Sequence, residues 1–506
     1  MTSAARSVAA VDLGATSGRV AVGVYEDDRV GLDVAHRFRN EPVWLPDGLH
    51  WNLPTLHRDV LDGLALAADG RRLDGIGIDS WGCDYALLDS GNRVLGLPYH
   101  YRDPDRTAPT VLARAFERVG QHELYARTGI QTMPINTIFQ LVSEAQTPAA
   151  VAASRIALIP DLLGLWLTGS LRNEFTAAST TGLLDARDQR WALDLIERLG
   201  ISTAPFQSEI APPGIELGPV LEGHSAGAAG VAGAAVGSIV RTVASHDTAS
   251  AFVATTLLGP GTAVISSGTW SLVGIELDEP MLGADAEAFN LTNERGFEDT
   301  VRVLRNVMGL WLIEEFRRGC GPDAPTYAEL YAEASSAGSQ VPLFDPDRDE
   351  LLHPGPMVER ISALCAAGSQ RPPSGRGELV ASILTSLACK YRLVVEQLEV
   401  VSGRRIDRVQ VVGGGSQNQL LCQVTADTLG REVLAGPAEA TLLGNVLTQL
   451  AALGEVSTLA EMRELSGRSI SLRHYLPASG SDGEGVYQRF LQVTGLSTGR
   501  PVSTAI

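Results

Sequence analysis

Near its N-terminus the chain reads VAAVDLGATSGRVAVGV over residues 8–24, and this run already indicates the class of fold. Residues 8–11 are rich in β-forming side chains, and the valines from Val20 to Val24 alternate with smaller neighbours. Between them lies a small, polar, glycine-containing segment. The pattern predicts a strand, a tight turn and a second strand. Residues 73–79 predict a further buried strand, which ends at a Ser-Trp-Gly sequence.

A similar unit recurs in the second half of the chain. Residues 263–265 predict a strand, residues 266–269 (SSGT) a turn, and residues 270–275 a second strand. Two such units about half a chain apart suggest a duplicated domain. Apolar residues at three- to four-residue steps over 383–398 predict a helix that ends at Gly403, and a strand over 409–412 follows. Strands alternating with helices predict an α/β protein.

Length and charge limit the possible functions. The 506 residues are enough for two to four domains, and 44% hydrophobic residues are typical of a globular protein. The 59 acidic residues outnumber the 40 basic ones, which gives a net charge of −19. Such a charge argues against nucleic acid as a partner. An anionic substrate would therefore need local backbone amides or a metal ion.

The cysteines and the N-terminus bear on the compartment. Five widely spaced cysteines without a CxxC pair argue against a disulfide scaffold and against structural zinc, and favour a reducing compartment. The start MTSAARSVAAVDLG has no long apolar core, so we expect no secretory signal. The Gly/Ala-rich residues 225–240 are too weakly apolar to span a bilayer. We expect a cytoplasmic protein that does not associate with membranes.

The turn DLGATSGR (residues 12–19) can bind phosphate. Its glycines allow a ligand close to the backbone, and the hydroxyls of Thr16 and Ser17 with exposed N–H groups can surround phosphate oxygens. Asp12 at the strand end can hold Mg²⁺ through water. A plain β-turn remains the alternative, and the run is not a Walker A loop because no Gly-Lys-Ser/Thr follows.

The second candidate is SHDTAS (residues 245–250). Asp247 lies where a strand gives way to a helical pattern, so it is either a helix N-cap or a general base that accepts a hydroxyl proton during phosphoryl transfer. His246 beside it can bind a polar substrate or be structural.

Further candidates lie along the chain. Thr269 in the second turn can meet a phosphate from the other domain, and residues 413–415 (GGG) offer a flat surface for a nucleotide. Residues 81–84 (WGCD) and Asn306 suit a polyhydroxylated ligand, although Trp81 can equally belong to the core. We interpret Cys83 as a small filler because no base partner is evident.

The order of these motifs resembles the FGGY family of carbohydrate kinases. The resemblance is carried by DLGATSGR, IGIDSWGCDYALLD (76–89), YRDPDRT (101–107), SHDTASA, SSGTWSL and VVGGGSQN (411–418), and it extends over about residues 8–453. It implies two ribonuclease-H-like domains of the actin, hexokinase and Hsp70 type, with ATP and sugar in the cleft between them. We expect an N-terminal domain over 1–240, a C-terminal domain over 241–478, and a C-terminal segment over 479–506 with a partly disordered tail. In that segment SGSDGEG (479–485) is typical of a linker and STGRPVSTAI (497–506) of a frayed tail.

The resemblance also implies roles for individual residues. It implies ATP contacts from Ala15, Thr16, Ser17, Gly18, Arg19, Thr269 and Gly414, a Mg²⁺-side carboxylate from Asp12, and sugar contacts from Gly82, His246, Asp247, Thr248 and Asn306. Asp247 is implied as the proton acceptor. The implied activity is transfer of the ATP γ-phosphate to the C1 hydroxyl of a ketose. A narrower resemblance, carried by GIQTMPINTIFQL (129–141), FNLTNERG (289–296) and LRNVMGLWLIEE (304–315), implies L-rhamnulose.

Other functional hypotheses remain open at this point. A kinase of the same family could act on L-fuculose, D-xylulose or L-ribulose in place of L-rhamnulose. An ATPase switch of the actin or Hsp70 type would use the same cleft, but Asp247 and the WGCD run speak against it. A catalytically silent sugar sensor is a third reading, and the intact turns on both sides argue against it. We expect a monomer or a homodimer whose partners are the small-molecule ketose and ATP, with Mg²⁺ as a cofactor.

Overall fold

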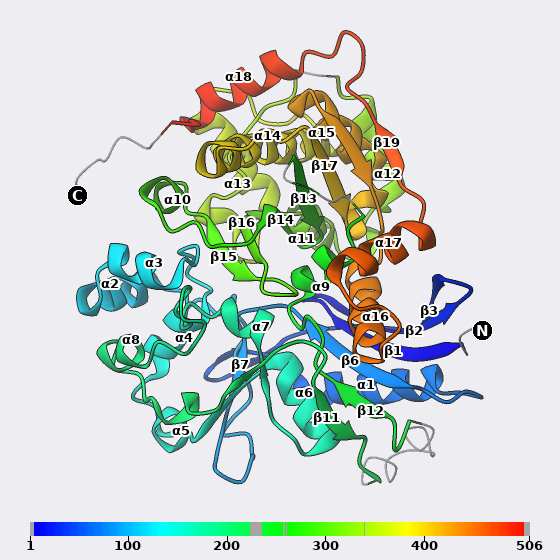
Figure 1. Ribbon diagram of the computed structural model, residues 1–506. Coiled ribbons are helices and arrows are strands. Elements are labelled where there is room, and N and C mark those ends of the chain that lie inside the picture. The colour runs from blue at the N-terminus through cyan, green and yellow to red at the C-terminus, as the bar shows by residue number, and fades with distance from the viewer. Residues whose placement is uncertain (1–4, 223–234, 257–258, 260, 339, 500–506) are drawn as a thin grey trace.

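Two mixed sheets dominate the computed structural model, which describes residues 5–222, 235–256, 259, 261–338 and 340–499. In Figure 1 the first sheet lies in the lower half and the second sheet in the upper half, with helices α9 (Asp247–Val253) and α16 (Ala440–Ala452) between them. The chain enters the second half after β12 (Ile239–Arg241), the last strand of the first sheet, and begins the second sheet at Thr262. The boundary after residue 240 stays a prediction, and it falls inside β12.

The first sheet is built around the N-terminal hairpin that the sequence predicts. Strand β1 (Arg6–Leu13) pairs antiparallel with β2 (Ser17–Glu26) and parallel with β6 (Gly75–Ser80), and this register sets Asp12 opposite Asp79. The order of the sheet is β11 (Glu216–Pro219), β12, β6 (Gly75–Ser80), β1 (Arg6–Leu13), β2 (Ser17–Glu26) and β3 (Arg29–Arg39).

The second sheet repeats this pattern of pairing. Strand β13 (Thr262–Ser267) pairs antiparallel with β14 (Trp270–Leu277) and parallel with β17 (Arg408–Val412), as β1 does with β2 and β6. The order is β15 (Thr292–Arg295), β16 (Val301–Met308), β14 (Trp270–Leu277), β13 (Thr262–Ser267), β17 (Arg408–Val412), β18 (Glu432–Ala435) and β19 (Arg473–Tyr475). Apart from the added edge strand β15, both sheets show the same six-strand sequence of directions, which confirms the predicted duplication.

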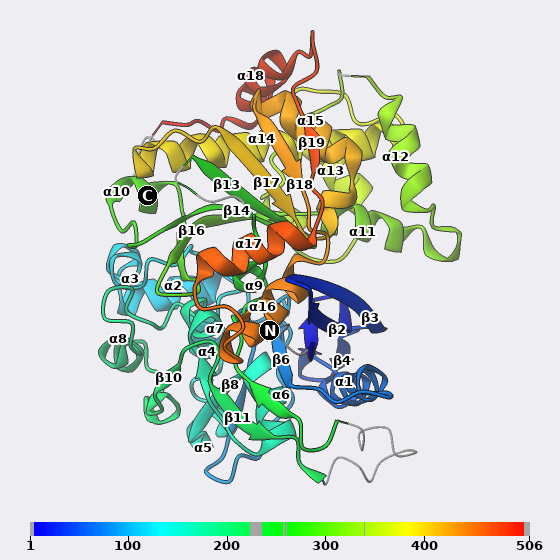
Figure 2. The same ribbon diagram turned by 45° about the vertical axis from the view of Figure 1, so that its right-hand side comes forward.

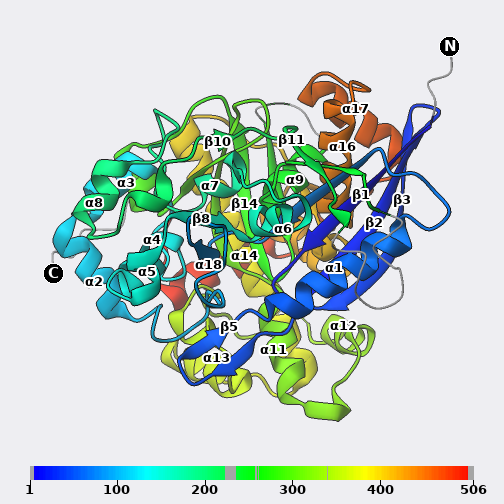
Figure 3. The same cartoon turned by 90° about the horizontal axis from the view of Figure 1, so that it is seen from below.

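Helices cover both faces of the first sheet. Because successive side chains of a strand point to opposite faces, Ala9 packs in the cluster that holds residues of α1 (Leu53–Ala67), whereas Val8 packs in the cluster that holds α9 and α16. Helix α1 lies along β2 and β3, as the view from below shows (Figure 3). Helix α16 lies between β18 and β19 of the second sheet in the chain, yet it packs on β1 and β6 of the first. It therefore ties the two halves together.

The contact between α9 and α16 is unusually close. A Cβ added at Gly444 of α16 would lie 1.8 Å from the carbonyl oxygen of Ser250 in α9. Glycine is the residue that allows two helix backbones to approach this closely. Helix α17 (Leu459–Ser469) packs on α9 and on β3 (Figure 2). The start of α9, where Asp247 lies, is thus held by elements of both halves.

Residues 85–211 add a side layer with a separate hydrophobic core, which includes Phe139, Leu195 and Phe206. Its elements, drawn mostly in cyan and blue-green in Figure 1, are β7 (Tyr85–Leu88), α2 (Pro109–Arg118), α3 (Gln121–Thr128), α4 (Thr137–Glu144), α5 (Pro148–Ala152), β8 (Arg155–Leu158), β9 (Asn173–Glu174), α7 (Phe175–Ser179), α8 (Leu193–Arg198) and β10 (Ile210–Ala211). Helix α6 (Ile159–Thr168), from the same stretch of chain, instead packs on the first sheet and buries its apolar residues in the larger core. A short hairpin of β4 (Val43–Leu45) and β5 (Gly48–His50) precedes α1.

Around the second sheet the longest helix is α14 (Arg376–Ser402). It ends at Gly403, whose φ of 64° is left-handed, as the sequence predicts for a glycine at this position. Besides α9, α16 and α17, this half contains α10 (Ala284–Ala288), α11 (Trp311–Gly319), α12 (Tyr327–Ser335), α13 (Met357–Ala367), α15 (Gln419–Leu429) and α18 (Gly483–Thr494). Within the described residues, no helix is long and apolar enough to cross a membrane.

Two segments differ from the expectation. The linker expected from residue 479 is wrong in part, because α18 begins at Gly483 and buries Tyr487 and Phe490 against the second half. The glycine-rich sequence of residues 214–237 predicts a loop-rich approach to the domain boundary, but β11 occupies 216–219 and pairs with β12. Residues 223–234 and 500–506, which include the end of the expected tail, lie outside the described residues.

Candidate active site

A cleft between the two halves brings nearly all the predicted residues together. It is lined by both predicted turns and by the start of α9. The predicted residues that line it are Asp12, Ala15, Thr16, Ser17, Arg19, Gly82, His246, Asp247, Thr248, Thr269, Asn306 and Gly414. Gly18 is the exception. It is buried, and a Cβ there would lie 2.2 Å from the Phe38 ring, so its lack of a side chain serves packing beneath the turn.

The first turn is held in shape by Asn40. Its side chain donates to the carbonyl oxygen of Gly14 at 2.9 Å, and its backbone N–H donates to that of Thr16 at 3.1 Å. A further backbone bond of 2.9 Å joins the Gly14 N–H to the Ser17 oxygen. These hydrogen bonds engage the carbonyl oxygens of the turn within the protein. Thr16 and Ser17, which carry hydroxyl groups, line the cleft. This is the arrangement that a phosphate-binding turn needs.

Two buried carboxylates lie directly behind this turn. Burial raises the pKa of Asp12 to about 6, against the nearby charge of Arg19 at 3.4 Å, and burial together with the charge of Asp12 raises the pKa of Asp79 well above its usual range. Asp79 Oδ2 accepts from Asn445 at 2.6 Å, while its Oδ1 is buried without a hydrogen-bond partner. The unpartnered Asp79 Oδ1 and the Asp12 carboxylate, which lines the cleft, are oxygen ligands of the kind that Mg²⁺ prefers. In the described residues no cluster of three or more such side chains could hold a metal alone, so the fit is to an ion that other ligands also coordinate.

Asp247 stands at the exposed end of α9. Asp247 is the first residue of the helix, and the N-cap position is held by His246, whose side chain makes no capping hydrogen bond. Asp247 is therefore not the N-cap that the sequence offered as an alternative. The Asp247 carboxylate accepts from the Thr248 hydroxyl at 3.0 Å and is 30% exposed. Backbone N–H groups of Ser245 and His246 donate to Glu174 and Thr176, both at 3.1 Å, which anchors this segment to the first half.

The opposite wall of the cleft offers polar groups without bulky side chains. A Cβ at Gly82 would lie 3.0 Å from the Thr180 hydroxyl and 3.4 Å from His246 Nε2, so only glycine leaves this space open. Asn306 is fixed by Gln131, whose Oε1 accepts from the Asn306 backbone at 2.8 Å and from its side chain at 3.1 Å. Burial raises the pKa of Cys83 well above its usual range, so it stays a thiol, in keeping with its interpretation as a filler.

The GGG run packs against the second turn. Gly413 has a φ of 79°, and a Cβ at Gly415 would lie 2.0 Å from Ser267 Oγ. A Cβ at Gly414, by contrast, would meet nothing within 4 Å. The run therefore presents a flat surface at Gly414, next to Thr269 in the same cleft.

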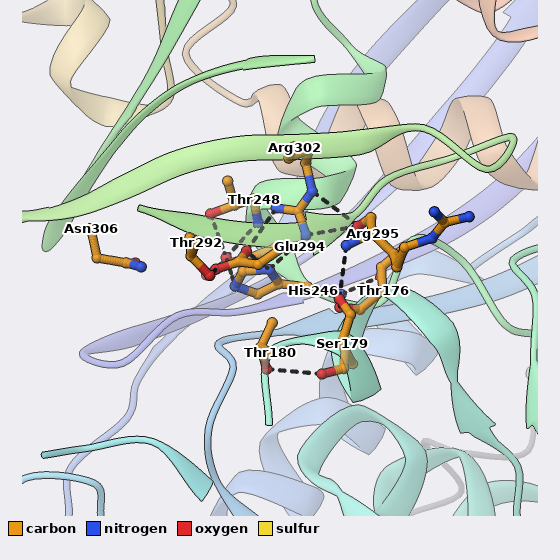
Figure 4. Close-up of polar contacts among 12 residues, drawn as sticks. Thr176, Ser179, Thr180, His246, Thr248, Thr292, Glu294, Arg295, Arg302 and Asn306 are labelled. Carbon is orange, nitrogen blue, oxygen red and sulfur yellow. Dashed lines mark hydrogen bonds and ion pairs between the residues drawn. The ribbon is translucent and has the colours of Figure 1, made fainter. Parts of the chain in front are cut away.

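Sequence reasoning missed two charged residues of the cleft region, Glu294 on β15 and Arg302 on β16. They are register partners, both are buried, and their side chains approach to 3.3 Å. Figure 4 shows them beside His246. Burial alone would favour neutral Glu294, but His246 and Arg302 outweigh it and lower its pKa. The sequence pattern of these two strands does not indicate that Glu294 and Arg302 contact His246.

Comparison with known proteins decides the family. The N-terminal domain of the FGGY family of carbohydrate kinases matches residues 8–254, and its C-terminal domain matches residues 263–453. This chain belongs to the FGGY family of carbohydrate kinases. It is therefore a sugar phosphotransferase, and the reading as an actin- or Hsp70-like ATPase switch is not favoured.

Relatives of this FGGY kinase carry a more specific name. Rhamnulokinase from Bacteroides thetaiotaomicron is 40% identical over 486 residues, which cover 95% of this chain and 98% of the relative. Rhamnulokinase from Pectobacterium carotovorum is 40% identical over 494 residues, 96% of each chain.

Solved structures agree on the fold of this FGGY kinase. Gluconate kinase from Lactobacillus acidophilus aligns with a TM-score of 0.75 at 14% identity, over 97% of this chain and 98% of that one. Xylulose kinase from Rhodospirillum rubrum aligns with a TM-score of 0.72 at 18% identity, over 96% and 97%. The two-domain α/β architecture is confirmed.

Proposed function

We propose that this FGGY kinase transfers the γ-phosphate of ATP to the C1 hydroxyl of L-rhamnulose, giving L-rhamnulose 1-phosphate and ADP. The substrate assignment is supported by the rhamnulokinases that align with almost the whole chain. The reaction type is supported by the family and by a cleft that two hydroxyl-bearing turns enter from opposite sheets.

The observation that carries the proposal is that the four carboxylates lining the cleft differ in how exposed they are and in whether an arginine pairs with them. The side chains of Asp12 and Glu294 are both only 5% exposed, and Glu439 is bound by Arg19 and Arg37. Asp247 is 30% exposed and has no arginine partner among the described ion pairs. A general base must reach the hydroxyl that it deprotonates. Of these four groups, Asp247 is the one positioned to do so.

Each remaining group then has a role in positioning. Thr16 and Ser17 hold phosphate oxygens from the first half, Thr269 holds them from the second, and Gly414 accommodates the adenosine. Mg²⁺ bound with ATP would neutralise phosphate charge beside Asp12. Because phosphoryl transfer requires positioning and charge stabilisation more than covalent help, these contacts account for most of the catalysis. Asp247 orients the C1 hydroxyl in line with the γ-phosphate and takes its proton.

The sugar side involves Gly82, His246, Thr248 and Asn306, which face the same space. Closure of the two halves would exclude water, which otherwise competes with the sugar as acceptor. We also expect the enzyme to work in the cytoplasm, as a monomer or a homodimer.

A panel of acceptors tests the proposal. ADP release is measured with Mg²⁺-ATP and L-rhamnulose, L-fuculose, D-xylulose, L-ribulose, glycerol or no sugar. We expect kcat/KM for L-rhamnulose to exceed that for every other sugar by about tenfold or more, which corresponds to about 1.4 kcal/mol of discrimination. A preference for another ketose would discard the substrate but keep the kinase. Turnover that no sugar changes would overturn the kinase mechanism itself.

A further inference from the structure

His246 stands between an arginine and two carboxylates, and these neighbours determine which of its nitrogens carries the proton. On one side, Arg302 Nη2 lies 3.2 Å and Glu294 Oε2 lies 3.4 Å from His246 Nδ1. On the other side, Asp247 Oδ1 lies 3.5 Å from His246 Nε2. Figure 4 shows the His246 ring next to Glu294 and Arg302, with Asn306 farther along the cleft.

Arg302 can only donate. A guanidinium group has five N–H donors, no acceptor, and keeps its charge in proteins. In its contact with His246, the Nδ1 atom must therefore be the acceptor. Arg302 is fully buried and also donates to the carbonyl oxygen of Arg295 at 2.9 Å and 3.1 Å, so its guanidinium is fixed in this orientation.

Glu294 does not need the His246 proton. Its carboxylate lies 3.3 Å from Arg302 Nη1, and this buried guanidinium compensates its charge. The pair is a cross-strand ion pair between β15 and β16 that is neutral as a whole. A neutral pair facing Nδ1, with a donor directed at that atom, favours the tautomer that has its proton on Nε2.

The Nε2–H then points to the sugar side of the cleft. Nε2 is the ring atom close to Asp247 and to the space that Gly82 leaves open. We propose that Arg302 is a positioning residue for sugar binding: it holds His246 in the Nε2–H tautomer, so that His246 donates a hydrogen bond to an oxygen of the sugar beside Asp247. This inference rests on the proposed sugar kinase activity and adds to it the residue that sets the donor.

Spectroscopy tests the tautomer without any substrate. In the full-length protein with ¹⁵N-labelled histidine, long-range ¹H–¹⁵N spectra distinguish a protonated ring nitrogen from an acceptor, and a His246→Gln variant assigns the signal among the nine histidines. We expect Nε2–H in the wild type. We expect Arg302→Met to move the proton to Nδ1, where Glu294 then attracts it. Arg302→Lys should restore Nε2–H, and Glu294→Gln should leave it unchanged because Arg302 still donates.

Kinetics gives a second readout. We expect Arg302→Met to raise the KM for the sugar by about tenfold, the effect of one lost hydrogen bond, while the KM for ATP stays within about twofold. The matched control is Arg463→Met, which removes another buried arginine ion pair, to Glu276 at 2.7 Å, near the far end of α9. That variant should lose stability without changing the tautomer or the sugar KM.

Several results would overturn the inference. One is an Nδ1–H proton on His246 in the wild type, and another is an unchanged tautomer in folded Arg302→Met. If Arg302→Met does not fold, the spectra of the wild type, Arg302→Lys and Glu294→Gln still test the inference. A loss of the Nε2–H proton in Glu294→Gln would show that Glu294, and not Arg302, sets the tautomer of His246. Failure of the wild type to phosphorylate L-rhamnulose would refute the proposed function but would leave the tautomer result intact.

Discussion

Asp84 is a single buried carboxylate that supports the wall of the cleft. It is 1% exposed and accepts hydrogen bonds from the indole N–H groups of Trp51 at 2.6 Å and Trp81 at 2.9 Å, and from the Gln140 amide at 3.0 Å. Burial outweighs these bonds and raises its pKa from 3.8 to about 6. The folded protein therefore binds this proton more tightly than the unfolded chain does.

A pH dependence of stability follows from this shift. Because the folded pKa of Asp84 is raised, its contribution to stability is greatest below about pH 4 and is lost as the pH rises to about 6. A shift of about two units corresponds to about 3 kcal/mol. Asp84→Asn cannot ionise, so we expect the difference in thermal midpoint, wild type minus variant, to fall between about pH 4 and 6 and to level off above. A difference that is constant or rises over this range would contradict the assigned shift.

Single residues also show what local sequence can and cannot predict. Asp247, Thr269 and Gly414 stand next to turns and strand ends, where small and polar residues form a visible local pattern. Glu294 and Arg302 lie within strands, where a polar residue is an ordinary part of the strand pattern and does not indicate a functional site. Their importance comes from His246, about 50 residues earlier in the chain, and such a contact depends on tertiary packing. The role of each predicted site residue in catalysis stays a prediction.

At the scale of elements, the crossing of α9 and α16 links the active site to the packing of the two halves. Gly444→Ala would place a Cβ 1.8 Å from the Ser250 oxygen, so one helix must move. We expect a loss of stability of about 1–3 kcal/mol, as is typical of overpacking, together with a lower kcat, because Asp247 begins the helix that moves.

The control for this variant is Gly319→Ala. Gly319 ends α11, and a Cβ there would meet nothing within 4 Å, so stability and kcat should stay near the wild-type values. Thermal unfolding and steady-state turnover of both variants measure the two effects. A Gly444→Ala enzyme with normal stability and normal kcat would show that the crossing does not fix the position of Asp247.

The elements that the sequence predicted well are those with strong local signals. The hairpin β1–β2 and the end of α14 at Gly403 follow from strand alternation and a left-handed glycine. Helix α18 was missed although Val486, Tyr487 and Phe490 have helical spacing, because glycines at 483 and 485 masked its start. Gly483 is required there by packing, since its Cβ would lie 1.9 Å from the Asp427 oxygen.

At the scale of the whole molecule, two similar sheets each present one turn to a shared cleft. The turns after β1 and after β13 lie at equivalent places in the two sheets. The order of the motifs along the chain was enough to predict this family and architecture. The way α16 returns from the second half to pack on β1 and β6 could not be predicted, because only the folded chain brings these elements together.

A ligand that both turns contact should draw the two halves together. We expect the radius of gyration from solution scattering to decrease when L-rhamnulose and a non-hydrolysable ATP analogue with Mg²⁺ are both present, and to decrease less with either ligand alone. D-Glucitol in place of the ketose is the control for a nonspecific effect of polyols. An unchanged radius with both ligands bound would argue that the halves do not close.

The most direct test of the account compares Asp247→Asn with the wild type for two quantities, the affinity for Mg²⁺-ATP and kcat with L-rhamnulose. Asp407→Asn, which changes an exposed carboxylate paired with Arg405, is the control. If Asp247 takes the hydroxyl proton, kcat should fall by about 10²- to 10⁴-fold while nucleotide affinity stays within about threefold. A near-normal kcat in Asp247→Asn would contradict the assignment of Asp247 as the base.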